Sequence, residues 1–433
     1  MIWIELLIVL LFIFIGARIG GIAIGYAGGA GVIVLTMGFG LKAGSIPVDV
    51  ILIIMAVIAS IAAMQNAGGL NYLVNLSDRL LRKDPKRITF LAPAVTYFMT
   101  LLSGTGHTVY ATLPVIVEVS KEGNVQPSRP LSISVVASQI AITASPISAA
   151  VVIFADYLEP FGVSYLELLA IAIPTTILAV TGGAFMSNFL AKPLDEDPAY
   201  IERKAKGLIK HEASEKQKDS KEAKYAVLIF LVAIIFVVAY ATLTSDKLGL
   251  ITNVPISRNE AIIAIMLLAA GVTAVVCKID IAKVTSMSTF KSGMSACICV
   301  LGVAWLGDTF VSNHIDEIKE AAGGLLNEYS WLLAVVLFFA SMLLYSQAAT
   351  TVALMPAALS LGVSPVAAIA SFAAVSALFV LPTYPTLIAA VEMDDTGTTK
   401  IGKYIFNHPF LIPGVVTIAL SVMFGFLIGG ILL

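Results

Sequence analysis

Four short clusters of small and hydroxyl-bearing residues interrupt long apolar stretches of this sequence. They are SGTGHT at 103–108, Ser145-Pro146 with Ser148, SQAATT at 346–351, and LPTYPT at 381–386. Hydroxyl and backbone N–H groups donate hydrogen bonds without adding a charge, and glycine or alanine lets a ligand approach the backbone closely. This combination suits reversible binding of a small anion, because a neutral cradle can replace the anion's water and still release it.

The candidate binding residues are the polar, small and helix-breaking members of these clusters. They are Ser103, Gly104, Thr105, Gly106, His107 and Thr108; Ser145, Pro146 and Ser148; Ser346, Gln347, Ala348, Thr350 and Thr351; and Pro382, Thr383 and Tyr384. We expect valine in place of Thr105 or Thr350 to remove a donor and to weaken binding about tenfold. His107 could donate to a carboxylate or carry a proton.

The same residues have two other interpretations. Gly, Ser, Thr and Pro in membrane helices often serve close packing, so a single cluster carries little weight and the case for binding comes from all four. In the second interpretation, Ser103 or Ser145 is the nucleophile of a membrane-embedded hydrolase with His107 as its base. A hydrolase is disfavoured because no carboxylate lies near His107 in the sequence to orient the ring.

The elements that must position these clusters are membrane-spanning helices. The chain has 433 residues, of which 58% are hydrophobic and only 12% are charged. A soluble domain carries about twice that charged fraction, and runs of about 20 apolar residues, enough for a helix to cross a bilayer, recur along this chain. The net charge of −2 indicates no nucleic-acid partner. The three cysteines predict neither a disulfide framework nor a metal site, and we expect no cofactor.

Basic residues mark the loops on the cytoplasmic side. The stretch at 78–87 carries five lysines and arginines, and the segment at 192–224 carries nine basic residues against eight acidic ones. The segment at 312–328 is mainly acidic, so we place it outside. When the basic loops are placed inside and the acidic segment outside, the apolar stretches between them predict about ten full spans, with both termini outside.

Two apolar stretches do not fit a simple crossing. The stretch at 88–120 is interrupted by SGTGHT and has basic residues at both ends, and the stretch at 329–361 is interrupted by SQAATT and begins at the acidic segment. We expect each to enter the membrane, turn and leave by the same face, as a re-entrant hairpin. A helix broken by proline follows each hairpin, at 130–158 and at 363–391.

The elements repeat with opposite orientation in the two halves. The predicted fold is an all-α polytopic membrane protein with an inverted repeat. Residues 1–190 hold helices 1–3, the first re-entrant hairpin and the first broken helix, residues 191–224 form a cytoplasmic linker, and residues 225–433 form the C-terminal half. Both hairpins contain the pattern T-x-x-A-x-[LM]-P, at 108–114 and 350–356. Interrupted helices in such repeats indicate a transporter's binding site, because each break exposes N–H groups and the positive end of a helix dipole.

Longer stretches resemble one family of carriers. GARIGGIAIG at 16–25, LLSGTGHTVYATLP at 101–114, TASPISAAVV at 143–152, SQAA at 346–349, and LPTYPT with DDTGTTKIGKYIFNHPFLIPG at 394–414 are similar to the anaerobic C4-dicarboxylate transporters of the Dcu type. The resemblance covers nearly the whole chain and is weakest at 192–224. It implies a secondary transporter, not an enzyme, that exchanges fumarate, malate, succinate or aspartate across the bacterial inner membrane during anaerobic growth. It also implies membership of a wider ion-transporter superfamily. In that superfamily a transport domain moves against a scaffold domain, in elevator-like alternating access.

Some features leave alternatives open. Arg18 could pair with a substrate carboxylate or mark the cytoplasmic turn between the first two helices. The second helix is rich in glycine (Gly20, Gly21, Gly25, Gly28, Gly29 and Gly31), which fits a homodimer interface and equally fits close packing within one chain. The expected partners are therefore small dicarboxylates, the lipid bilayer, a coupling ion (proton or sodium) and a second copy of the chain. A membrane sensor or co-sensor of dicarboxylates remains an alternative function, and a passive channel is disfavoured because the polar clusters gather at one depth.

Overall fold

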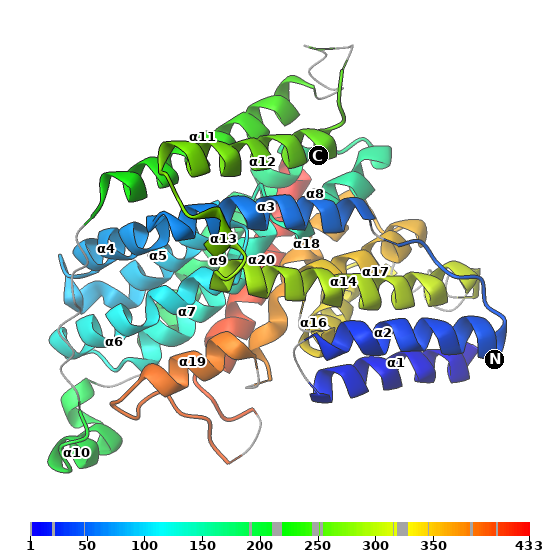
Figure 1. The fold of residues 1–433 in the computed structure, drawn as a ribbon. Helices are drawn as coiled ribbons and strands as arrows, with labels where there is room; N and C mark the ends of the chain where they lie inside the picture. Colours follow the sequence, from blue (N-terminus) through cyan, green and yellow to red (C-terminus); the bar gives the residue numbers. More distant parts are fainter. Residues whose placement is uncertain are drawn as a thin grey trace.

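The computed structural model describes residues 2–19, 22–46, 48–189, 193–209, 219–244, 251, 254–314, 316–317, 328–344, 346–381, 384–403 and 406–433. Gly20, Gly21, Pro382 and Thr383 lie outside the described residues, as do parts of the acidic segment and of the predicted linker. Within the described ranges the regular structure is helical (Figure 1). This agrees with the predicted all-α polytopic membrane protein.

The N-terminal half contains the predicted helices and one more. They are α1 (Ile2–Ile19), α2 (Ala23–Ile33) with a π-helical turn Val34–Gly38, α3 (Val48–Asn66), α4 (Gly69–Leu81), α5 (Ile88–Ser103), α6 (Leu113–Glu122), α7 (Ser128–Ile140), α8 (Ala149–Leu158) and α9 (Tyr165–Phe189). Short 3₁₀ segments occupy Pro85–Arg87, Gly106–Ala111, Ala141–Ala144 and Glu159–Phe161. The additional helix is α4, which is amphipathic and bends 71° from α3.

The described residues of the C-terminal half form a further series of helices. They are α11 (Lys221–Leu243), α12 (Arg258–Val276), α13 (Ile281–Val284), α14 (Ser288–Asn313), α16 (Leu332–Leu344), α17 (Gln347–Ser360), α18 (Pro365–Phe372) with a 3₁₀ segment Ala373–Phe379, α19 (Pro385–Met393) and α20 (Leu411–Leu432). Between the halves, a 3₁₀ turn Leu194–Glu196 and α10 (Pro198–Ala205) lie inside the predicted linker. α11 begins at Lys221, so the last residues of that linker are helical.

The number of membrane spans stays a prediction. Among the described residues, 6 helices are long and apolar enough to cross a membrane, or up to 7 if the bent pair α3–α4 counts as one span. Shorter apolar helices lie at Ile2–Gly16, Ala23–Gly38, Leu332–Met342 and Pro365–Phe379. These shorter helices include segments that the sequence predicted to be full spans or hairpin arms.

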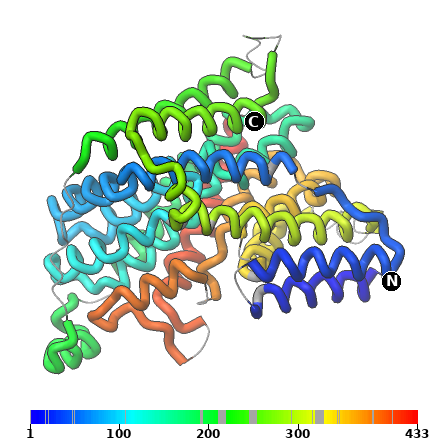
Figure 2. Tube along the Cα trace, viewed as in Figure 1, coloured from blue at the N-terminus to red at the C-terminus, as the bar shows by residue number. Residues whose placement is uncertain are grey.

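The helices pack in two groups. In group A, which comprises α1–α3 and α11–α14, α1 packs on α2, α2 on α14, α14 on α3, α3 on α12, and α12 on α11. In group B, which comprises α5–α9 and α16–α20, α9 packs on α20, α5 on α7, α16 on the segment Ala373–Phe379, and α18 on α20. Figure 1 shows α1, α2, α14, α3, α12 and α11 stacked one on the next, and Figure 2 traces how both halves of the chain contribute to the stack. α4 contacts α11 and α5 and so lies between the groups.

Glycines bring α2 and α14 close together. A side chain at Gly25 or Gly28 would collide with the backbone of α14, at Ile298 and Gly302 respectively. Packing within the chain therefore accounts for these two glycines of the second helix. Gly29, in contrast, has no atom within 4 Å of the position a side chain would take. The homodimer stays a prediction.

Polar contacts join the two groups at one end of the molecule. Arg258, at the start of α12, is ion-paired with Asp156 of α8, and Asn259 donates from Nδ2 to the same carboxylate at 2.8 Å. The guanidinium of Arg258 also lies over the ring of Tyr165, 5.4 Å from its centroid. Because α12 belongs to group A and α8 to group B, this pair connects the two groups in this conformation.

Candidate functional site

α5 and α6 form the first predicted hairpin. α5 gives way to Gly104, whose φ of 68° lies in the left-handed region that favours glycine. The chain then turns back, so that Gly123, just after α6, lies against Pro85, just before α5. Arg82 and Glu122 form an ion pair at the same end. The two ends of the stretch at 88–120 therefore meet, as a hairpin requires.

α16 and α17 pack on each other and form the second predicted hairpin. Ser346 caps α17, because its Oγ accepts a hydrogen bond from the backbone N–H of Ala349 at 3.2 Å. The backbone N–H groups of Gln347 and Ala348, in the first turn, have no partner within the helix. The tip of this hairpin therefore presents the positive end of a helix.

Both broken helices are interrupted at the predicted residues. After α7 and its 3₁₀ extension the chain is non-helical from Ser145, and Ser148 then caps α8 by accepting from the N–H of Val151 at 3.2 Å. In the second half, the 3₁₀ segment ends at Phe379 and α19 begins after Tyr384. Each break thus starts a new helix in the middle of a predicted span.

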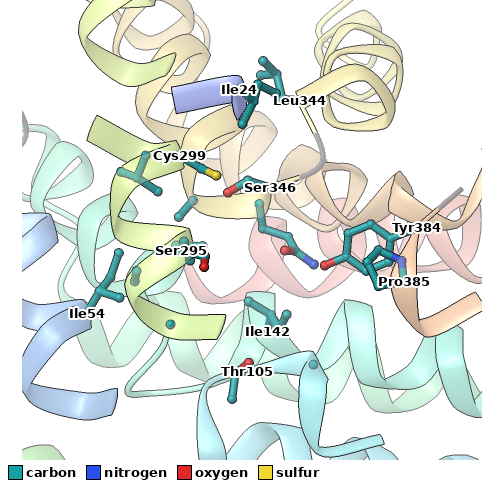
Figure 3. A pocket seen from close by; sticks show the side chains of 18 of the residues that line it. Ile24, Ile54, Thr105, Ile142, Ser295, Cys299, Leu344, Ser346, Tyr384 and Pro385 are labelled. Atoms are coloured by element: carbon teal, nitrogen blue, oxygen red, sulfur yellow. The ribbon is translucent and has the colours of Figure 1, made fainter. Parts of the chain in front are cut away.

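The four interruptions meet at one cavity of about 1120 Å³ between group A and group B (Figure 3). The predicted binding residues that line it are Ser103, Gly104, Thr105, Gly106, Ser346, Gln347, Ala348 and Tyr384. Figure 3 shows Thr105 facing Ser346 and Tyr384 across the cavity, with Ser295 and Cys299 of α14 on a further side. Neither of these two α14 residues was among the predicted binding residues.

The remaining described candidates do not line the cavity. Five of them are buried, and each donates its hydroxyl proton to a main-chain carbonyl. In the first half, Thr108 donates to Thr105 at 3.3 Å, Ser145 to Leu101 at 2.6 Å and Ser148 to Ile142 at 2.6 Å. In the second half, Thr350 donates to Ser346 at 2.8 Å and Thr351 to Gln347 at 2.7 Å. Pro146 also lies away from the lining, and its carbonyl accepts from the Tyr165 hydroxyl. The side chain of His107 lies outside the described part of the chain, as do Pro382 and Thr383. In this conformation these hydroxyls are therefore bonded to main-chain carbonyls and not directed into the cavity.

The charges around the cavity favour an anion. The first residues of α8, α17 and α19 line it, so three helix N-termini contribute positive partial charge there. Arg18 is the only charged residue among the described residues of the lining. It shares a face of α1 with Leu10 and Phe14, which also line the cavity, and it lies in the last turn of that helix. Its position therefore fits both roles considered for it.

A buried glutamine, Gln139, contacts residues of two of the interruptions. It lies in α7 and is fully buried, and its Oε1 accepts from Nε2 of Gln347 at 3.0 Å. Its own Nε2 donates to Oγ1 of Thr386 at 3.2 Å, and its backbone carbonyl accepts from the Ser376 hydroxyl at 3.2 Å. Gln139 was not among the predicted residues. The signal that could have identified it is a lone amide within the apolar stretch at 130–158.

The fold and the cavity define a class, the polytopic helical transporters, in which interrupted helices surround a central site. The solved structure of the YdaH transporter from Alcanivorax borkumensis has a similar fold, with a TM-score of 0.57 over 87% of this chain and 85% of that one. The sequence identity of 14% limits this similarity to the fold.

Sequence comparison identifies the family. A family model described as the anaerobic C4-dicarboxylate membrane transporter matches residues 1–433. The C4-dicarboxylate transporter DcuA of Wolinella succinogenes is 64% identical over 429 residues, and that of Escherichia coli K12 is 57% identical over 434 residues, with at least 99% of each chain covered. The anaerobic C4-dicarboxylate transporter DcuB of Escherichia coli O6:H1 is 36% identical over 98% of this chain and 97% of its own. The chain belongs to the anaerobic C4-dicarboxylate transporter family, as its resemblance predicted.

Proposed function

We propose that this protein is a secondary carrier that exchanges C4-dicarboxylates, among them fumarate, malate, succinate and aspartate, across the bacterial inner membrane during anaerobic growth. The observation that carries the proposal is the convergence of four chain interruptions on one cavity. The names of the relatives support the substrate class. A proton or sodium ion remains the expected coupling partner.

Helix N-termini and hydroxyls account for binding without a strong fixed charge. A carboxylate at the start of α17 would accept from the N–H groups of Gln347 and Ala348, which the helix leaves unpaired. Thr105 lies on the opposite hairpin tip and Tyr384 at the start of α19. An elongated diacid has a carboxylate at each end, so the two hairpins can each hold one end. Weak, distributed donors also allow release, which a carrier needs on every cycle.

The shape of the cavity supports alternating access. Its lining extends along α1 from Leu10 to Arg18 and along α14 from Val300 to Thr289, toward the helix ends beside the basic loops. We therefore infer that this conformation opens to the cytoplasm, with both termini outside and the two halves as inverted repeats. In elevator-like transport, group B would then move against group A. The wall that α3 supplies, from Ile54 to Ile61, is apolar and offers no hydrogen bonds that such sliding would have to break.

A carrier fits the serine geometry better than a hydrolase does. Ser103 donates its hydroxyl proton to the carbonyls of Thr105 at 3.2 Å and Thr100 at 3.4 Å, and Ser145 donates to Leu101 at 2.6 Å. A nucleophilic serine instead directs its proton to a base. These bonds stabilise the interruptions and leave no hydroxyl of the pair directed at a described base.

Counterflow in proteoliposomes tests the proposal. Purified protein is reconstituted into vesicles that contain either unlabelled succinate or buffer alone, and uptake of labelled fumarate is followed. An exchanger accumulates fumarate faster in the loaded vesicles, and malate and aspartate compete while citrate does not. Equal uptake into loaded and empty vesicles would indicate a channel or uniporter, and the absence of uptake in both would contradict dicarboxylate transport.

A further inference from the structure

Gln347 is held in one orientation at the tip of the second hairpin. The residue is only 6% exposed, and its Nε2 lies 3.0 Å from Oε1 of Gln139 and 3.4 Å from the backbone carbonyl of Gln139. A backbone carbonyl can only accept a hydrogen bond. A flipped amide would place two acceptor oxygens against each other, so the network assigns the nitrogen to the Gln139 side.

The remaining polar atom of this amide, Oε1, faces the cavity. Gln347 lines the cavity, and no described residue forms a hydrogen bond with its Oε1, which is not among the enclosed polar atoms that lack partners. The backbone N–H of the same residue, together with that of Ala348, is unpaired in the first turn of α17. One residue thus offers a donor for a carboxylate and, beside it, an acceptor for a neighbouring donor.

We propose that Gln347 recognises the substituent on carbon 2 of the bound diacid. A carboxylate held by the N–H groups of Gln347 and Ala348 brings carbon 2, its covalent neighbour, next to Oε1. In aspartate that carbon carries an ammonium group and in malate a hydroxyl, and both donate hydrogen bonds. Succinate and fumarate carry no donor there. This inference rests on the proposed function and deepens it: the cavity binds 2-amino and 2-hydroxy diacids in preference to unsubstituted ones.

Gln139 acts on this preference as a positioning residue. Its Nε2 is bound to Thr386 in α19 and its carbonyl is bound to Ser376, so α7, α19 and the segment before the second break fix its amide. The amide of Gln139 in turn fixes that of Gln347. The acceptor at the cavity is therefore preorganised before substrate binds, which lowers the entropy cost of using it.

The substitution Gln347→Met tests the inference, because methionine has nearly the same length but no acceptor oxygen. Succinate-loaded proteoliposomes take up labelled fumarate while succinate, malate or aspartate is added outside. For each competitor, the concentration that halves uptake is measured. We expect Gln347→Met to raise this concentration for aspartate about tenfold relative to succinate, and for malate by a smaller factor, because a hydrogen bond from a charged donor is the stronger of the two.

Ser295→Ala is the matched control. Ser295 lines the same cavity from α14 and donates to the carbonyl of Lys291 at 2.9 Å, away from α17. Its substitution should leave the aspartate-to-succinate ratio unchanged. The inference is overturned if Gln347→Met weakens all competitors by one factor, or if Ser295→Ala shifts the ratio as strongly.

A measurement on the unaltered protein gives an independent answer. 2-Methylsuccinate has a substituent of similar size on carbon 2 but no donor, so it should compete no better than succinate and clearly less well than malate. Competition equal to that of malate would overturn the inference. If the unaltered protein exchanges no dicarboxylate at all, the proposed function itself fails, and that result differs from an exchanger without the preference.

Discussion

Hydroxyl side chains at the four interruptions have two different surroundings. Thr105 and Ser346 line the cavity, whereas Thr350 and Ser145 are fully buried and donate to main-chain carbonyls. A break within a membrane helix frees carbonyl groups that need donors, because lipid supplies none. Hydroxyls of the second kind therefore help to maintain the shape of the site, whereas those of the first kind lie at the surface of the cavity.

The two substitutions Thr105→Val and Thr350→Val, made one at a time, compare a hydroxyl that lines the cavity with one that is buried. Valine keeps the shape of threonine but removes the hydroxyl. We expect Thr105→Val to weaken the apparent affinity for all C4-dicarboxylates about tenfold, because a donor facing the carboxylate is lost. Thr350→Val should leave the affinity nearly unchanged and lower the stability by about 1 kcal/mol, because it removes one bond to the Ser346 carbonyl. Exchange kinetics and thermal unfolding of the purified variants measure both effects.

The opposite pattern would contradict this division. If Thr350→Val weakened binding while Thr105→Val did not, the hydroxyl facing the substrate would belong to the second hairpin, and the cavity in this conformation would not be the binding site. Equal losses of affinity in both variants would support the prediction that both Thr105 and Thr350 bind the substrate. They would also show that burial in this conformation does not decide whether a hydroxyl binds substrate.

The positions of the interruptions were predictable from sequence, but the roles of single residues were not. Glycine, serine and proline within an apolar stretch reveal a break through composition alone. Whether a hydroxyl turns to a carbonyl of its own helix or into the cavity depends on its direction around the helix, and both directions use the same residue types. Gln139 shows the same limit, because its importance lies in contacts with Gln347 and Thr386, more than 200 residues away in the chain.

At the scale of elements, hydrophobic length predicted most helices and missed α4. The stretch at 78–87 was predicted to be a cytoplasmic loop from its five basic residues, and no helix was predicted between residue 66 and that stretch. In the structure Gly69–Leu81 form an amphipathic helix that contacts both α11 and α5. Such a helix lacks the uniform apolar run that marks a span, so length and composition alone do not find it.

Contacts between α8 and α12 give a test of relative motion. Asp156 and Arg258 bring group B and group A together in this conformation. In a background without native cysteines, we expect cysteines introduced at both positions and joined by a short bifunctional thiol reagent to stop exchange, since the groups can no longer separate. A reagent cleaved by reduction should restore exchange when the bridge is cut.

A second cysteine pair is the control for effects of the cross-linking reaction itself. Ser45 and Asp308 lie within group A, where the backbone N–H of Ser45 donates to the Asp308 carboxylate at 2.5 Å. Cross-linking these positions should leave exchange intact, because no relative motion within the group is required. Persisting exchange with the Asp156–Arg258 pair fully cross-linked would rule out a transport cycle that separates the two groups at this end.

At the scale of the whole molecule, both halves of the chain contribute to each helix group. α2 of the first half packs on α14 of the second, and α3 packs on α12. This pairing of helices from the two halves was not predicted from the sequence, because it depends on long-range packing such as the close approach of Gly28 and Gly302. The cavity between the groups follows from the packing.

Accessibility of position 348 tests the central claim most directly. The three native cysteines are replaced by serine, Ala348→Cys is introduced at the cavity lining, and a membrane-impermeant thiol reagent is applied to oriented vesicles from one face or the other. A carrier with its site at the hairpin tips predicts labelling from both faces, slowed by succinate but not by acetate. Labelling from one face only, or at the same rate with and without succinate, would contradict alternating access at this site.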